Sequence, residues 1–138
     1  MTVADTNLLS ELTKPAPSRR IMDWWDSQPR SELFVTAVTQ AEILFGIELL
    51  PLGRRRAALE SAARETFEII FAGRILPFDT AAAREFAEIA VKRRKLGLPL
   101  SQSDGQIAAI ARACGAILAT RNTADFEHCG VALVNPWA

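Results

Sequence analysis

The sequence predicts an α/β fold, an α/β/α sandwich around a central and mainly parallel sheet. Short apolar segments alternate with longer segments of helical periodicity along the whole chain. Ala116–Ala119 is apolar at every position, as expected of a strand that is buried on both faces of a parallel sheet. With 138 residues, of which 49% are hydrophobic and 23% charged, the chain is large enough for one hydrophobic core, and a single domain over residues 1–138 is expected.

The chain begins with the apolar segment Met1–Ala4, which predicts a short buried strand. A polar turn then leads into a helical stretch over Asn7–Leu12, and Pro15 and Pro17 interrupt it.

The next element is a helix over Arg19–Ser27, which Ser18 begins and Pro29 follows. It carries adjacent tryptophans, Trp24 and Trp25. Because neighbouring helical residues point about 100° apart, only one of the two is expected in the core, and the other is a candidate for a protein interface.

A strand over Leu33–Ala37 is predicted by its β-forming apolar residues. A helix from Thr39 to about Leu50 follows, stopped by Pro51 and Gly53, and residues 54–72 have helical periodicity again. The helix before Pro51 carries an apolar stripe that fits core packing or partner binding: Ile43, Leu44, Ile47 and Leu50.

The second half of the chain continues the alternation. Arg74–Phe78 predicts a short strand at a sheet edge, because Pro77 limits its pairing. Helices are expected over Ala81–Leu96, which Gly97 follows, and over Ser103–Ala113, which Gly115 closes. The last strands are Ala116–Thr120 and Val131–Val134.

Composition argues against several classes of function. The net charge is zero, so the chain has no overall attraction to nucleic acid. The basic runs Arg54–Arg56 and Lys92–Lys95 fit solvated helix faces, with RNA contact as the alternative.

Cys114 and Cys129 form no paired motif, and the sole histidine, His128, cannot complete a zinc site with them. No segment is long and apolar enough for a membrane span, and the first residues have no basic signal region, so a cytoplasmic protein is expected.

Four acidic residues stand where a strand ends or a helix begins: Asp5, Glu42, Asp104 and Asp125. In open parallel sheets, functional groups collect at the carboxyl ends of the strands. Helix capping is the competing interpretation. Thr39 and Ser101 stand three residues before Glu42 and Asp104, a capping-box spacing, and Asp5 can begin the first helix.

The acidic positions taken together favour a metal site. Clustered carboxylates repel one another, and a divalent cation such as Mg²⁺ or Mn²⁺ offsets that cost. Such a site is suited to hydrolysis of phosphodiester bonds by a metal-activated water, with no nucleophilic side chain. A phosphate-accepting receiver domain is disfavoured, because Asp5 is followed by Thr6 and no lysine follows the last strand. A non-catalytic binding module whose acids only cap helices is a further alternative.

Several motifs resemble those of PIN domains, and in particular of VapC-type toxins of type II toxin–antitoxin pairs in their FitB-like branch. Four of these motifs contain the acids, and two do not. They are Asp5-Thr6-Asn7, Thr39-x-Ala41-Glu42, Asp104–Ala109, Thr120–Phe126, Phe71–Asp79 and Asn135–Trp137. The resemblance covers essentially the whole chain.

The resemblance implies a PIN-like fold and an endoribonuclease that requires Mg²⁺ or Mn²⁺. It also implies a homodimer, inhibition by a cognate antitoxin, and a higher assembly that binds operator DNA through the antitoxin. The family's metal ligands map onto Asp5 and Asp104, and its other acidic positions map onto Glu42 and the Thr120–Asp125 block.

The fourth acid is assigned to Asp125, because this chain has asparagine at position 122 where FitB-like sequences can carry aspartate. Asn122 is an alternative that could hydrogen-bond substrate or water. Four further residues are candidates to support the site or contact substrate: Thr6, Asn7, Ser103 and Thr120. Helix initiation is an alternative explanation for Thr6, Asn7 and Ser103.

Overall fold

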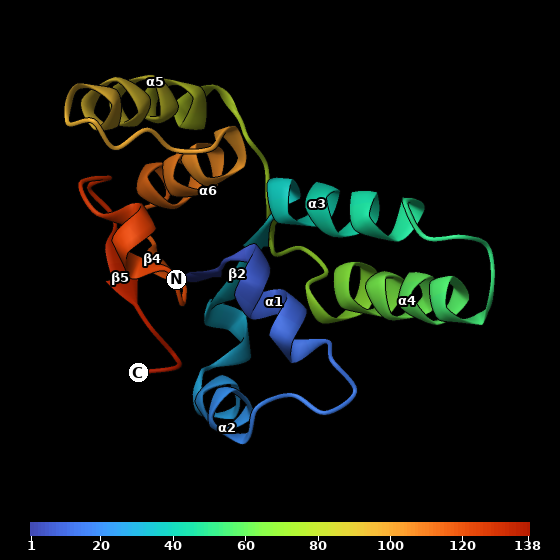
Figure 1. The fold of residues 1–138 in the computed structure, drawn as a ribbon. Helices are drawn as coiled ribbons and strands as arrows, with labels where there is room; N and C mark the ends of the chain where they lie inside the picture. The colour runs from blue at the N-terminus through green and yellow to red at the C-terminus, as the bar shows by residue number, and fades with distance from the viewer.

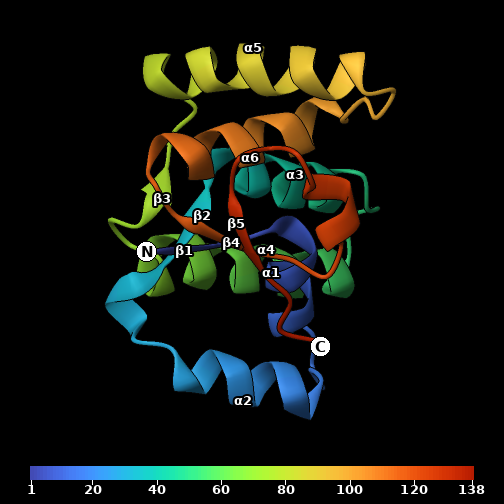
Figure 2. The same ribbon diagram turned by 90° about the vertical axis from the view of Figure 1, so that its left-hand side faces the viewer.

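The computed structural model describes residues 1–138 and contains a five-stranded sheet with helices on both faces (Figures 1 and 2). The strand order is β3-β2-β1-β4-β5, and every neighbouring pair is parallel. The strands are β1 (Thr2–Ala4), β2 (Leu33–Thr36), β3 (Ile75–Leu76), β4 (Ile117–Ala119) and β5 (Ala132–Val134). The predicted α/β sandwich with a parallel sheet is confirmed.

Six α-helices connect these strands, with three short turns of other helix types. The helices are α1 (Thr6–Leu12), α2 (Arg19–Ser27), α3 (Ala37–Glu48), α4 (Arg54–Glu65), α5 (Thr80–Lys95) and α6 (Gln102–Ala113). The turns are η1 (Arg30–Glu32), η2 (Thr66–Ile70) and η3 (Thr123–Phe126). None of these helices is long and apolar enough to cross a bilayer.

Most elements differ from the predictions by a residue or two at their ends, and two of the differences have a clear structural cause. Helix α3 begins at Ala37 instead of Thr39, because the side chain of Thr36 caps it by accepting a hydrogen bond from the backbone N–H of Thr39. The helix predicted over residues 54–72 is α4 followed by the π-helical turn η2.

The hydrophobic core has two parts, one on each face of the sheet. Val3 and Ala4 of β1 are both fully buried, and they pack into different parts because successive strand residues face opposite sides. Helices α5 and α6 cover one face and α1 and α2 the other (Figure 2). Trp25 is the buried tryptophan of α2 and packs edge-on against Phe71, with ring centroids 5.8 Å apart, whereas Trp24 is half-buried against the same core.

Strand β1 lies in the centre of the sheet, and its carboxyl end marks the edge at which the candidate site lies. Its neighbours are β2 on one side and β4 on the other, with Thr2 in register with both Leu33 and Ile117. The carboxyl ends of these parallel strands therefore share one edge, where α1, α3 and the loop after β4 begin. This is the kind of edge at which open parallel sheets bind ligands.

Candidate active site

Asp5 follows β1 directly and serves as the cap of α1. Its Oδ1 accepts a hydrogen bond from the backbone N–H of Leu8 at 2.8 Å, and its Oδ2 accepts one from the hydroxyl of Thr120 at 2.6 Å. Only 4% of the residue is exposed. Asp5 therefore caps a helix and is also held by the loop after β4, so capping does not exclude a second role for its carboxylate.

Burial raises the pKa of Asp5, and this effect outweighs the hydrogen bonds from Thr120 and Leu8, which lower it. The carboxylates of Asp104 and Glu42 raise the pKa of Asp5 further. Asp104 and Glu42 thus lie close enough to disfavour the charge of Asp5, and a cation near Asp5 would relieve that cost.

Glu42 lies in the second turn of α3 and does not cap the helix, so the capping-box interpretation with Thr39 is wrong. The hydroxyl of Thr6 donates to Glu42 Oε1 at 2.8 Å and lies 2.9 Å from the hydroxyl of Thr39. Because Thr6 has a single hydroxyl proton, which it donates to Glu42, Thr39 must be the donor to Thr6. This chain of hydroxyls joins α1 to α3, and the fully buried Thr39 anchors it.

Asp104 lies in the first turn of α6. Ser101 caps this helix by accepting a hydrogen bond from the backbone N–H of Asp104 at 3.2 Å, while the Asp104 carboxylate makes no return bond to Ser101. The adjacent Gly105 fits tightly against α5, since a Cβ there would lie 2.9 Å from Cε2 of Phe86. Helix packing thus fixes the backbone beside Asp104 and leaves its carboxylate free.

The loop after β4 contributes Asn122 to the site. Thr120 is fully buried, and its hydroxyl accepts a hydrogen bond from the backbone N–H of Asn122 at 3.0 Å while it donates to Asp5. Asp125 lies in η3, is exposed, and is not among the residues that line the cavity at Asp5. Ser103 is also outside that cavity and lines a neighbouring groove between α3 and α6.

A polar cavity of about 230 Å³ brings the site together at the carboxyl edge of the sheet. Seven of its eight lining residues are not hydrophobic. The residues are Asp5, Thr6, Asn7, Glu42, Ser101, Asp104, Asn122 and Phe126. Carboxylates from three separate segments therefore face one space.

The donor set suits a hard divalent cation. No group of three acidic, histidine or cysteine side chains is arranged closely enough to form a complete ligand set. Mg²⁺, however, is usually held by one or two carboxylates and completes its coordination with water and substrate phosphate. Asp5 and Asp104 meet that requirement, because both acidic residues line the polar cavity.

Two lining residues, Ser101 and Phe126, were not proposed from the sequence as parts of the site. The spacing of Ser101, three residues before Asp104, is a sequence pattern that indicates a helix cap and not a site residue. No sequence pattern marks Phe126 as a site residue, because a buried phenylalanine is expected in any core.

Comparison with known proteins gives a consistent result. The PIN-domain family model matches residues 2–131. The chain is 39% identical to the VapC ribonuclease Y4jK of Sinorhizobium fredii, over 99% of this chain and 98% of that protein. It is 36% identical to toxin FitB of Neisseria gonorrhoeae, over 99% of each chain. The structure of FitAB bound to an IR36 DNA fragment superimposes with a TM-score of 0.92 at 36% identity, covering 100% of this chain and 96% of the other.

Proposed function

This chain belongs to the PIN-domain family, in the branch of the VapC and FitB toxins, and on that premise we propose that it is an Mg²⁺- or Mn²⁺-dependent endoribonuclease. One observation carries the proposal. Asp5, Glu42 and Asp104, from three separate segments of the chain, line the same polar cavity at the carboxyl edge of the sheet.

Asp5 and Asp104 are the residues proposed to hold the cation. A divalent ion bound there would offset the charge of a phosphodiester group and lower the pKa of a water molecule. The raised pKa of Asp5 supports this assignment, because a buried carboxylate beside two others gains most from a cation.

Glu42 is proposed to act as the general base. Thr6 holds one of its oxygens, and no protein donor bonds the other, which is free to accept a proton from a water in the cavity. The side chain of Asn122 can donate a hydrogen bond to that water or to the phosphodiester. Asp125 was predicted as the fourth acid, but the cavity favours Asn122 for this position.

The proposed partners are an RNA substrate, a second copy of the chain and a cognate antitoxin, through which the assembly would bind operator DNA. The similar FitAB complex is itself bound to a DNA fragment, which supports the last of these partners. This chain leaves several large apolar side chains exposed on and near α3, as expected of a surface that binds protein. They include Phe45 (66% exposed), Leu49 (69%) and Leu52 (87%). The cytoplasm, which holds the RNA, is the proposed compartment.

The proposal is tested by incubating the purified chain with RNA and Mg²⁺ or Mn²⁺, with and without EDTA. Cleavage should require the metal and should be lost in Asp104→Asn. Glu42→Gln should reduce kcat by about 10²–10⁴-fold, the usual contribution of a general base. Glu65→Gln is the matched control, since Glu65 is also an exposed glutamate but lies in α4. Undiminished cleavage in EDTA, or in Asp104→Asn, would refute the proposal.

A further inference from the structure

Arg121 lies between two residues of the candidate site and stacks on a tryptophan. Its neighbour Thr120 bonds Asp5, and its neighbour Asn122 lines the cavity. The guanidinium carbon of Arg121 lies 5.5 Å from the ring centroid of Trp137. Trp137 is half-buried against the core, so its ring is a fixed support for the arginine.

The stacked guanidinium is not neutralised by an ion pair. A guanidinium that lies over an aromatic face keeps the N–H groups at its edge available for a planar, bidentate partner. The positive charge of Arg121 acts on Glu11, but only weakly. The pKa of Glu11 is lowered mainly by hydrogen bonds from Lys14 and from the backbone of Ser18, and least by the charge of Arg121. Glu11 is already paired with Lys14 at 2.5 Å. Arg121 is therefore a positioned cation with free donors.

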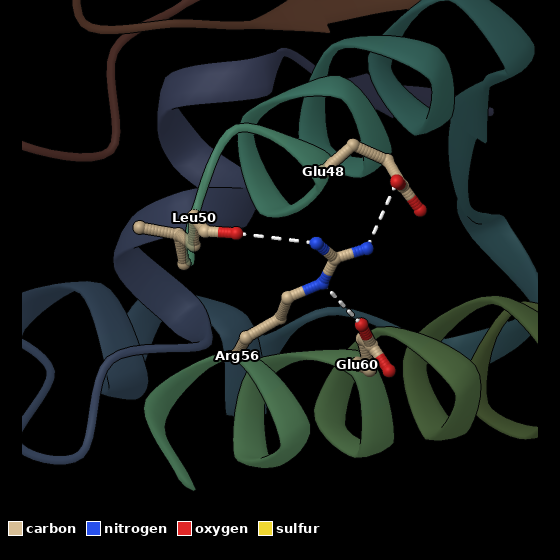
Figure 3. Close-up of polar contacts among 4 residues, drawn as sticks. All are labelled: Glu48, Leu50, Arg56 and Glu60. Atoms are coloured by element: carbon tan, nitrogen blue, oxygen red, sulfur yellow. Dashed lines mark hydrogen bonds and ion pairs between the residues drawn. The ribbon is translucent and has the colours of Figure 1, made fainter. Parts of the chain in front are cut away.

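Other arginines of the chain serve the fold itself. Arg56 bonds Glu48 at 2.9 Å, Glu60 at 2.7 Å and the backbone carbonyl of Leu50 at 3.1 Å, and so ties α4 to the end of α3 (Figure 3). Arg112 pairs with two glutamates of α5. Arg121 makes no comparable set of contacts, which distinguishes it from these structural arginines.

The cavity, which the adjacent Asn122 lines and Arg121 does not, presents an electrostatic difficulty for the proposed substrate. Three carboxylates face the cavity, and the whole chain has no net positive charge to attract RNA. A strand of RNA that enters the site must therefore gain its attraction from local cations. Arginine is well suited to this task, because its planar fork matches the oxygens of a phosphate group.

We propose that Arg121, supported by the ring of Trp137, binds a phosphodiester group of the RNA strand next to the group that occupies the carboxylate cavity. The inference rests on the proposed ribonuclease function and adds a substrate-binding subsite to it. In this assignment Arg121 contacts RNA, and Trp137 is a positioning residue that acts through the arginine.

The subsite is tested by RNA binding, separately from cleavage. The affinity of the full chain for a fluorescent single-stranded RNA is measured by anisotropy in EDTA at several salt concentrations. Arg121→Gln should weaken binding several-fold and reduce the slope of log K against log salt by about 0.7, the value for one phosphate contact on a single strand. Arg84→Gln is the matched control, since Arg84 is also exposed and belongs to the N-terminal half of α5, whose N-terminal end lies at the opposite edge of the molecule (Figure 2).

Trp137→Leu keeps an apolar side chain and removes the aromatic face. It should weaken RNA binding in the wild-type background and have little effect in Arg121→Gln, because it acts only through the arginine. Wild-type affinity and salt slope in Arg121→Gln would overturn the subsite, as would an equal loss in Arg84→Gln. A lower Tm with an unchanged salt slope would also overturn it, by showing that the stack only anchors the C-terminus. Metal-dependent cleavage by wild type is scored in a parallel reaction, so failure of the ribonuclease proposal is recognised independently.

Discussion

Thr120→Val removes one hydroxyl from the support of Asp5 with almost no change in side-chain volume. That hydroxyl is fully buried, donates to Asp5 Oδ2 at 2.6 Å and accepts from the N–H of Asn122 at 3.0 Å. The substitution leaves a buried carboxylate oxygen and a half-buried N–H without these partners. The variant is therefore expected to be less stable than wild type.

The expected loss of unfolding free energy in Thr120→Val follows from the charge of Asp5, which accepts the hydrogen bond of the Thr120 hydroxyl. A hydrogen bond to an ionised group contributes about 1.5–3 kcal/mol. With an unfolding entropy of about 2.1 cal/mol/K per residue, a chain of 138 residues loses roughly 5–10 °C in Tm for this change.

The loss should depend on pH, because Thr120 stabilises the ionised form of Asp5. Burial raises the pKa of Asp5 in the folded chain above its ordinary value. Proton binding by Asp5 therefore stabilises the fold fully at pH values below the ordinary pKa, and this stabilisation is lost as the pH rises through the folded-state pKa. Without the Thr120 hydroxyl, which lowers this pKa, the pKa rises further. The variant should therefore fall further below wild type near neutral pH than in acid.

Thermal melts in EDTA at about pH 4 and pH 7 measure this difference, since unperturbed Asp titrates near 3.9. Thr120→Ser is the control, because it keeps the hydroxyl and should restore most of the Tm. An equal loss of Tm at both pH values, or no difference between the valine and serine variants, would refute the role assigned to Thr120.

Three further predictions concern the site and the core. Thr39→Val removes the hydroxyl behind Thr6, so kcat for RNA cleavage should fall with little change in KM, and Thr39→Ser should restore it; normal kcat in the valine variant would contradict the hydroxyl chain. Asn122→Ala should lower kcat/KM more than Asp125→Asn, because only Asn122 lines the cavity, and the reverse order in cleavage assays would return the fourth position to Asp125. Phe71→Ala should cost about 3–5 kcal/mol in urea unfolding, since the ring is 1% exposed, and a loss below about 1 kcal/mol would be inconsistent with that packing.

The order of helices and strands was predictable from the sequence because it follows from local patterns. Helix α2 has the predicted bounds, Arg19–Ser27, since serine and proline mark its ends. The start of α3 was less accessible, because Thr36 and Thr39 are both reasonable caps and the choice depends on where β2 ends. The π-helical turn over Thr66–Ile70 was missed because apolar periodicity does not distinguish it from a continuing α-helix.

The sequence placed Asp5, Glu42 and Asp104 at one edge, since strand and helix order determines which segment ends meet there. The sequence assigned the fourth position to Asp125, whereas the cavity is lined by Asn122, because which of the two faces the site depends on how Thr120 orients the loop. The contact between the hydroxyls of Thr6 and Thr39 was also hidden. Those residues are 33 positions apart, and either hydroxyl alone fits a helix start.

The direct test of the metal site is thermal unfolding with and without Mn²⁺. A ligand that binds only the folded state at a hundred times its Kd stabilises it by about 2.7 kcal/mol, which for a chain of 138 residues is roughly 9 °C in Tm. Wild type should show this increase at saturating Mn²⁺, and Asp104→Asn should lose most of it while remaining folded. A Tm of wild type that Mn²⁺ leaves unchanged, or an equal increase in Asp104→Asn, would contradict a cation held by Asp5 and Asp104.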